Sequence, residues 1–252
     1  MVANLITNQQ KEQFQEEGYF ILESVIPSSS LSILRDTCDR LVEETDAELE
    51  KEDKKSRNIT HGQKRYFISN RHKDSMELKR YIFSDIMADI CRATLGPSAY
   101  LFWEQFVVKG PEVGMKFGWH QDSGYVGHDH RPYLSCWATL DDVSENNGTV
   151  YILPYSRAGT KDRQEHVVEE GSNDKIGYFG DDPGIPVIAP AGSIAVFSSV
   201  SFHRSSPNIS EGWRRVYLTQ YSAEPILSKD GSELWGNADP ILVEGKKVNF
   251  NK

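Results

Sequence analysis

The sequence predicts a mainly β fold with flanking α-helices, in which a β-sandwich or a jelly-roll barrel is braced on one face by a helical N-terminal part. Two observations predict it. Up to about residue 98, apolar side chains recur at helical spacing, whereas beyond it short apolar runs alternate with turn signals. Many short strands in succession are typical of such β folds. A chain of 252 residues can bury a substantial core in a single domain.

The N-terminal part contains three predicted helices and one strand. The pattern at residues 7–10 resembles a capping box and starts a helix that Gly18 ends. Residues 19–22 form an apolar run suited to a strand. Apolar residues at three- and four-residue spacing then predict amphipathic helices over residues 29–50 and 75–95.

The strands follow after residue 98. They are predicted at residues 100–108, 116–120, 134–140, 149–153, 186–188, 193–197 and 214–222. Turn residues such as Asn146-Asn147-Gly148 separate them, and Gly148 there tolerates a positive φ. Residues 155–185 hold few apolar runs and are expected to be a long excursion, which is often functional. We expect one domain over 1–252, with 1–98 as mainly helical support, 99–225 as the core and 226–252 as a C-terminal extension.

Composition excludes several classes of partner. The formal net charge is −9, from 28 basic and 37 acidic residues, so nucleic acid and anionic membrane surfaces are unfavourable partners. Residues 1–10 lack a signal-peptide pattern and no apolar stretch is long enough to span a membrane. The three cysteines, Cys38, Cys91 and Cys136, are odd in number and widely spaced, which argues against disulfides. We therefore expect a cytoplasmic protein that acts on a small molecule.

The chemistry is expected at His120 and Asp122. In a strand, side chains alternate between faces, so these two would point the same way and Gln121 would point opposite. One imidazole and one carboxylate on a common face can bind a divalent metal ion, and a second histidine would complete a set that leaves positions open for other ligands. A His-x-Asp pair alone is weak support, because it occurs by chance in many chains.

His203 is the best candidate for that second histidine. It follows an apolar strand after a short serine-rich turn and precedes Arg214 by eleven residues. An arginine at the start of the next strand could clamp a carboxylate through two parallel hydrogen bonds, although Arg214, like Arg215, could also lie at the surface. The remaining histidines are His61, His72, His128, His130 and His166. Of these, His128 and His130 stay an alternative pair if residue 119 is not in a strand.

Longer blocks resemble a known family. The segment at residues 118–122 (GWHQD), the later segment at 146–157 (NNGTVYILPYSR) and the segment at 203–208 (HRSSPN) followed by Gly212-Trp213-Arg214 are similar to the phytanoyl-CoA dioxygenase family in order and spacing. Residues 14–22 (FQEEGYFIL) resemble its N-terminus. The resemblance implies a double-stranded β-helix, the cupin-like jelly roll, with iron(II), 2-oxoglutarate and dioxygen.

The resemblance also implies residue roles. Three residues match the family's iron ligands: His120, Asp122 and His203. Five match residues that contact the cosubstrate or line its site: Arg214 at the distal carboxylate, Ser205, Gln121, Trp137 and Lys109. Trp137 could also be a plain core residue. Because Asp122 is retained where halogenating members carry a small residue, oxygenation is favoured over halogenation.

The expected activity is hydroxylation of an unactivated C–H bond, with succinate and carbon dioxide as coproducts. Two alternatives are a non-catalytic jelly-roll binding protein and a metal-dependent isomerase or hydrolase on a cupin-type barrel. The substrate pocket is expected from the N-terminal region, residues 123–133 and residues 155–185, where Gly171, Gly177, Gly180 and Gly184 would permit motion. Aromatic residues in that material are Tyr66, Phe67, Tyr125, Tyr133, Tyr178 and Phe179, and arginines are Arg65, Arg71, Arg131 and Arg157. The arginines could meet an anionic substrate or simply lie at the surface.

Overall fold

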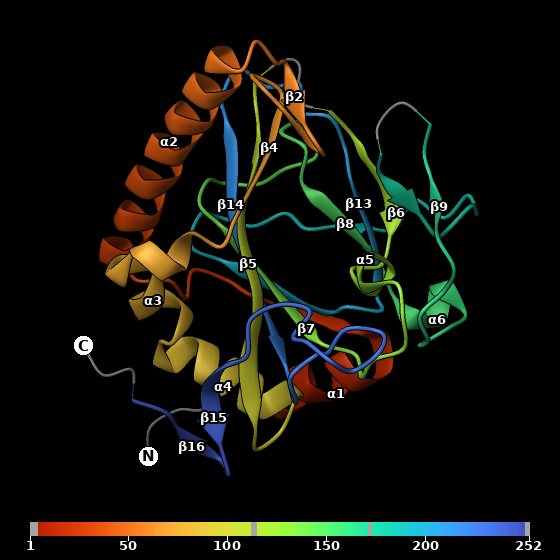
Figure 1. The fold of residues 1–252 in the computed structure, drawn as a ribbon. Coiled ribbons are helices and arrows are strands. Elements are labelled where there is room, and N and C mark those ends of the chain that lie inside the picture. The colour runs from red at the N-terminus through yellow and green to blue at the C-terminus, as the bar shows by residue number, and fades with distance from the viewer. Residues whose placement is uncertain (1–4, 112–114, 171–172, 250–252) are drawn as a thin grey trace.

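The computed structural model describes residues 5–111, 115–170 and 173–249 (Figure 1). The longer helices are α1 (Asn8–Glu17), α2 (Ser28–Lys51), α3 (Met76–Ile82) and α4 (Asp85–Thr94). One-turn helices are α5 (Ser123–Val126), α6 (Tyr155–Ala158) and the 3₁₀ helix η1 (Arg71–Asp74). Gly171 lies outside the described residues.

Most strands belong to two antiparallel sheets. The larger has the order β1 (Tyr19–Leu22), β12 (Ile194–Ser198), β7 (Leu134–Thr139), β14 (Arg214–Ser222), β5 (Ala99–Lys109), β4 (Arg65–Ser69), β3 (Thr60–His61) and β2 (Ser56–Arg57). β15 (Asp239–Val243) adds to β5 and pairs with β16 (Lys246–Lys247). The smaller has the order β11 (Ile185–Pro186), β8 (Val150–Leu153), β13 (Phe202–Ser205) and β6 (Phe117–His120). β9 (Val167–Val168) and β10 (Lys175–Ile176) form a separate hairpin.

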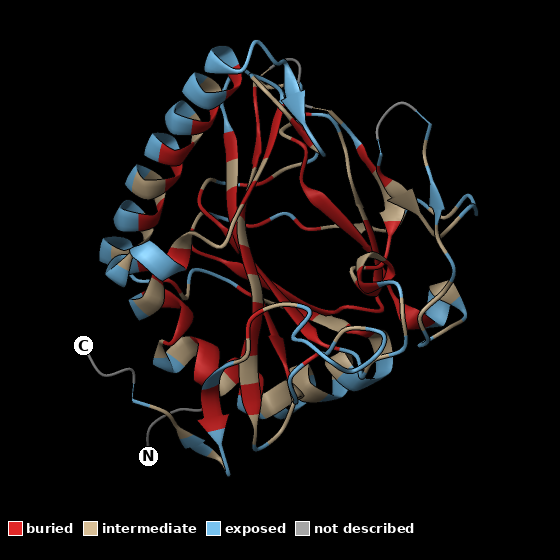
Figure 2. Cartoon of the chain, in the orientation of Figure 1, coloured by how far each residue is buried: buried red, intermediate tan, exposed pale blue. Residues whose placement is uncertain are grey.

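The core has two layers. One lies between the N-terminal helices and the larger sheet, where Cys38 and Met87 pack in the same cluster as Phe106 and Tyr217. Figure 2 shows that α2 turns its buried side toward the sheet and its exposed side outward. The other layer lies between the sheets and contains Trp137, Ile152 and Phe197. This arrangement confirms the predicted jelly-roll class with helices bracing one face.

The helix expected over residues 75–95 is two helices. Ser75 caps α3 by accepting from the backbone amide of Leu78, and Ser84 caps α4 by accepting from that of Met87. The apolar spacing continues across the break, which is why periodicity alone merged the two. The capping box of Thr7 and Gln10 is present as predicted.

Two strands near the site were not predicted. β4 pairs with β5 over five residues, and β13 lies between β6 and β8. Both are short and contain arginine or histidine among their apolar residues, so neither forms the apolar run from which the other strands were predicted. As a result, residues 1–98 supply strands β1 to β4 of the larger sheet in addition to their helices.

The excursion at residues 155–185 packs along β6. Gly177 donates its amide to the carbonyl of Trp119, and the Ile176 side chain lies so close to Gly118 that a Cβ there would come within 2.9 Å of it. Among the described helices, none is long and apolar enough to cross a membrane. All three cysteines are buried and free.

Candidate metal centre

Two histidines lie side by side between the sheets. His120 ends β6, and the register of β6 with β13 places it directly opposite His203. Their ring centroids are 4.1 Å apart, and both residues are buried. The pairing of two strands that are far apart in sequence therefore produces the pair.

Asp122 completes the cluster, but its backbone is helical and not extended as predicted. β6 ends at His120, and Asp122 adopts helical backbone angles of φ −58° and ψ −36° at the start of α5. Its Oδ1 lies 3.5 Å from Nε2 of His203 and 3.9 Å from Nε2 of His120. One ligand atom from each residue lies within 4.8 Å of the others, which fits a single metal ion. No other such group occurs among the described residues.

Both histidines have their Nε2 atom available to bind a metal ion. Nδ1 of His120 lies 2.8 Å from the carbonyl of Gly118, and Nδ1 of His203 lies 3.1 Å from that of Ser201. A carbonyl can only accept, so Nδ1 carries the proton in each ring and Nε2 keeps its lone pair for a metal. Burial, followed by the charge of His203, holds the pKa of His120 well below its ordinary value, so this ring stays neutral.

The carboxylate of Asp122 is held from behind. Its Oδ2 accepts hydrogen bonds from Ser135 Oγ at 2.6 Å and from Gln220 Nε2 at 2.9 Å, which leaves Oδ1 facing the imidazoles. Burial alone would raise the pKa of Asp122. The imidazoles of His203 and His120 and the Ser135 hydroxyl outweigh it and lower the pKa to about 2. The site therefore offers two imidazole nitrogens and one carboxylate oxygen, a set typical of non-haem iron(II) sites with open positions.

Three buried cations form a row beside this cluster. Lys109 of β5 pairs in register with Arg65 of β4 on one side and with Arg214 of β14 on the other. All three line one small cavity of about 60 Å³, together with His120 and His203. The charge of Arg65 is balanced by Asp174 through two hydrogen bonds of 2.9 Å. Lys109 donates to the carbonyl of Ser206.

Arg214 has no carboxylate partner among the described residues. Its Nη1 donates to the carbonyl of Val107 at 3.1 Å, and its buried Nε has no hydrogen-bond partner. Burial lowers the pKa of Arg214 to about 10, and the guanidinium carbon lies 5.5 Å from the ring centroid of Trp137. Burying an unpaired cation is costly, so this cavity is suited to an anion.

The other residues expected at the cosubstrate lie in two places. Trp137, Lys109 and half-buried Ser205 line the small cavity with Arg214. Gln121 points away from it: its Nε2 donates to the carbonyls of Val200 and Asp162, and its Oε1 accepts from the amide of Gln164.

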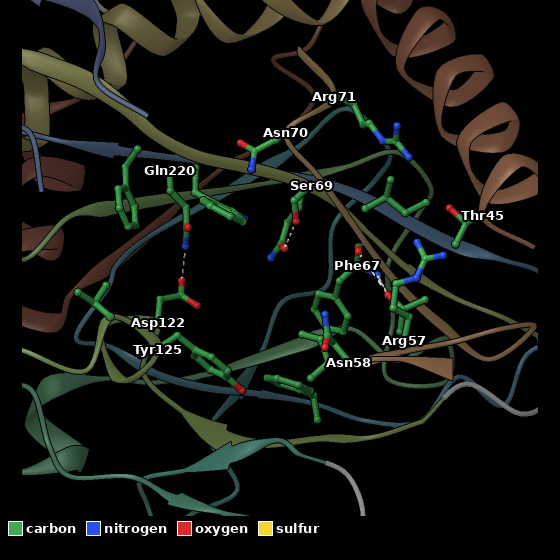
Figure 3. Close-up of a pocket in the computed structure, with 18 of the residues that line it drawn as sticks. Thr45, Arg57, Asn58, Phe67, Ser69, Asn70, Arg71, Asp122, Tyr125 and Gln220 are labelled. Carbon is green, nitrogen blue, oxygen red and sulfur yellow. Dashed lines mark hydrogen bonds between the residues drawn. The ribbon is translucent and has the colours of Figure 1, made fainter. Parts of the chain in front are cut away.

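A larger cavity of about 670 Å³ opens on the other side of the cluster. Phe67, Phe117, His120 and Asp122 line both cavities, so the two meet at the candidate metal centre. Figure 3 shows Asp122, Tyr125 and Gln220 on one side of this space and Arg57 and Arg71 on the other. Of the described residues in this excursion, 155–170 and 173–185, none lines it, contrary to our expectation, whereas the N-terminal region and residues 123–133 do.

The alternative histidine pair is engaged elsewhere. His128 Nε2 lies 2.7 Å from the carbonyl of Leu227, and His130 Nε2 lies 3.0 Å from Ser123 Oγ. Sequence reasoning missed Ser135 and Gln220. These two are partners in the register of β7 with β14, a relationship that no local pattern reveals.

The fold and the cluster together define a non-haem iron oxygenase of the jelly-roll class. The family model "Phytanoyl-CoA dioxygenase (PhyH)" matches residues 14–216, and the chain belongs to this family of iron(II)- and 2-oxoglutarate-dependent dioxygenases.

Similar proteins agree with this assignment. A probable alpha-ketoglutarate-dependent hypophosphite dioxygenase of Stutzerimonas stutzeri is 24% identical over 96% of this chain and 87% of its own length. Ectoine dioxygenase of Bordetella bronchiseptica is 24% identical, covering 90% of this chain and 79% of its own. Peroxisomal phytanoyl-CoA dioxygenase of Mus musculus is 21% identical, covering 91% and 72%.

Solved structures share the fold. EvdO2 from Micromonospora carbonacea var. aurantiaca, complexed with 2-oxoglutarate, superposes with a TM-score of 0.68 at 22% identity over 92% of this chain and 94% of that one. The non-haem alpha-ketoglutarate-dependent carbocyclase SnoK from nogalamycin biosynthesis has a TM-score of 0.68 at 18% identity over 95% and 94%.

Proposed function

We propose that this protein hydroxylates an unactivated C–H bond of a small-molecule substrate, with His120, Asp122 and His203 as the iron(II) ligands. The observation that carries the proposal is the junction of two cavities at His120 and Asp122, with His203 lining the smaller one. The small cavity contains a buried guanidinium that has no carboxylate partner among the described residues and whose Nε makes no hydrogen bond, and the large one has room for an organic molecule.

The residues that line the site fit iron(II) and 2-oxoglutarate. Two Nε2 lone pairs and one carboxylate oxygen match an iron(II) ion that keeps positions open. Arg214 would take the distal carboxylate of 2-oxoglutarate, with Lys109 and Ser205 beside it and the Trp137 ring against the guanidinium. When bound, the iron would activate dioxygen, which is the oxidant, and 2-oxoglutarate would supply two electrons as it is converted to succinate and carbon dioxide.

The chain's own residues then orient the iron ligands, hold the substrate and keep water away from the metal position. Ser135 and Gln220 fix the orientation of the Asp122 carboxylate, so that Oδ1 faces the metal position. Phe67 and Phe117 line the junction of the two cavities, where an apolar wall limits water. The substrate's C–H bond would lie in the large cavity, next to His120 and Asp122.

The test is succinate release under air from purified protein supplied with iron(II) and 2-oxoglutarate. We expect slow succinate formation that zinc does not support, since zinc has no redox chemistry. Asp122→Ala should abolish it while the protein remains folded. Normal succinate release and iron content in Asp122→Ala would refute the ligand assignment. Absence of succinate from the unaltered protein would favour the binding-protein or isomerase alternatives.

A further inference from the structure

We propose that the substrate is an organic anion with a largely apolar body, and that Arg71 binds its anionic group in the large cavity. This inference rests on the proposed function, because it takes that cavity as the substrate site. It depends on the charges that line the cavity, on how Arg71 is held there, and on the side chains that form the walls.

The charged residues that line the cavity are Arg57, Arg71, Glu48, Asp74 and Asp122. Arg57 is neutralised by Glu48 at 3.0 Å and also pairs with Glu52 outside the lining. Asp122 belongs to the candidate metal centre. Asp74 is exposed. Arg71 is half-buried, and among the described residues no carboxylate lies within ion-pair distance of its guanidinium. It is thus the cation left for a ligand.

The backbone around Arg71 is held on both sides. Buried Glu104 of β5 accepts from the amide of His72 at 2.9 Å and lies 3.1 Å from its Nδ1, while its own carbonyl accepts from the amide of Asn70. Asn70 has a positive φ of 59°, and its side chain accepts from Asn237 at 2.9 Å. Such anchoring reduces the conformational entropy lost when a ligand is bound.

Figure 3 shows Arg71 and Asn70 on the wall of the cavity, with Asp122 across from Arg71 in this view. A ligand that spans the cavity can therefore place its anionic group at Arg71 and another part near the metal position. A guanidinium suits carboxylate and phosphate alike, because both offer two oxygens to its planar donors.

The remaining walls indicate the body of the ligand. Seven aromatic side chains line the cavity: Phe67, Phe102, Trp103, Phe117, Tyr125, Tyr133 and Trp235. The volume of about 670 Å³ is in the range of drug-sized ligands, far more than a bare inorganic anion fills. An anion with a flat apolar body matches both features.

The test is a binding measurement that needs no turnover. Zinc-loaded protein with 2-oxoglutarate is titrated with 2-naphthoate, 2-naphthyl phosphate and the neutral 2-naphthamide, followed by ligand-observed NMR. We expect at least one anion to bind about tenfold or more tightly than the amide, because the guanidinium forms charge-assisted hydrogen bonds with the anion and only ordinary ones with the amide. Preference for the carboxylate or the phosphate distinguishes the two sources of the anionic group.

Matched variants make the result specific. Arg71→Gln should remove the preference for the anion, Arg71→Lys should keep part of it, and Arg80→Gln, at an exposed arginine of α3, should keep all of it. Asp74→Asn should tighten anion binding, because it removes a nearby negative charge. The proposal is overturned if neither anion binds better than the amide, or if Arg71→Gln retains the preference. Either outcome leaves the iron-dependent release of succinate untouched, so the two proposals fail separately.

Discussion

Ser135 Oγ donates a 2.6 Å hydrogen bond to Oδ2 of Asp122, and this contact turns the other carboxylate oxygen toward His120 and His203. Ser135 also accepts from Gln220 Nε2 at 3.0 Å, so the two form one network behind the carboxylate. The metal position thus depends on side chains of the larger sheet, whereas both histidines come from the smaller one.

Ser135→Ala should weaken metal binding. Loss of a group that orients a ligand typically lowers metal affinity about 10- to 100-fold. The measurement is iron(II) or zinc affinity by competition with a chelator under nitrogen. Ser32→Ala, at an exposed position of α2, is the control and should bind metal normally. Equal affinities for Ser135→Ala and the unaltered protein would show that Gln220 alone is sufficient to orient the carboxylate.

Arg214→Lys should raise the concentration of 2-oxoglutarate required for half-maximal succinate release, with little change in iron affinity. Lysine keeps the charge but loses the two-pronged fit, at a cost of roughly 1.5–3 kcal/mol, or about ten- to a hundredfold. Arg215→Lys is the matched control, because Arg215 pairs with Asp141 and Asp39 instead of lining the small cavity. An unchanged requirement in Arg214→Lys would move the carboxylate clamp to Lys109.

Lys109→Met should stabilise the protein without 2-oxoglutarate and weaken 2-oxoglutarate binding. Burial, followed by the charges of Arg214 and Arg65, lowers the pKa of Lys109 well below 10.5. Lys109 therefore binds its proton more tightly in the unfolded chain than in the folded one. The free-energy cost of burying the charged side chain decreases as the pH rises from the lowered pKa toward 10.5.

Thermal unfolding at neutral and alkaline pH checks this. The melting temperature of Lys109→Met should exceed that of the unaltered protein at pH 7, and the difference should narrow as the pH approaches 10. Lys229→Met, at an exposed lysine, should show neither effect. A lower melting temperature for Lys109→Met at pH 7 would mean that the bond to the Ser206 carbonyl outweighs the burial of the charge.

Much of the candidate site could be predicted from local sequence patterns, but little of its surroundings could. The His-x-Asp motif and His203 come together because β6 pairs with β13, and only the pattern of β6 is visible in the sequence. The helical backbone of Asp122 was not visible in the sequence, because a helical turn and an extended strand both fit the three polar residues that follow Trp119. Ser135 acts on Asp122, 13 positions away, and the backbone next to Arg71 is held by a contact of His72 with Glu104, 32 positions away. Such contacts appear only once register and topology are set.

The segment 155–185 illustrates the same limit. Its length and its glycines suggested a cover for the substrate, yet the three described glycines, Gly177, Gly180 and Gly184, lie in close packing. A Cβ at Gly177 would lie 2.6 Å from the ring of His166, and Gly184 has a positive φ of 74° beside Trp119. The described part of the segment packs against β6, and none of its residues lines the large cavity.

Gln121 is one of the residues that attach this segment, and its replacement gives the last prediction. Its Nε2 donates to the carbonyls of Val200 at 2.7 Å and Asp162 at 3.0 Å, and its Oε1 accepts from the amide of Gln164 at 2.7 Å. Gln121→Met keeps the size of the side chain but removes all three bonds, and each buried group left unpaired costs about 1–3 kcal/mol. Amides near Gln164 should therefore exchange with deuterium faster in this variant.

The requirement for 2-oxoglutarate should stay close to normal in Gln121→Met, because the side chain points away from the cavity that contains Arg214. Hydrogen exchange followed by mass spectrometry, together with a 2-oxoglutarate titration of succinate release, separates the two roles for Gln121. Faster exchange with a normal titration assigns it to anchoring the segment, since contact with the cosubstrate is then unnecessary. A tenfold higher requirement with unchanged exchange would assign it to the cosubstrate, as its position in the motif suggests.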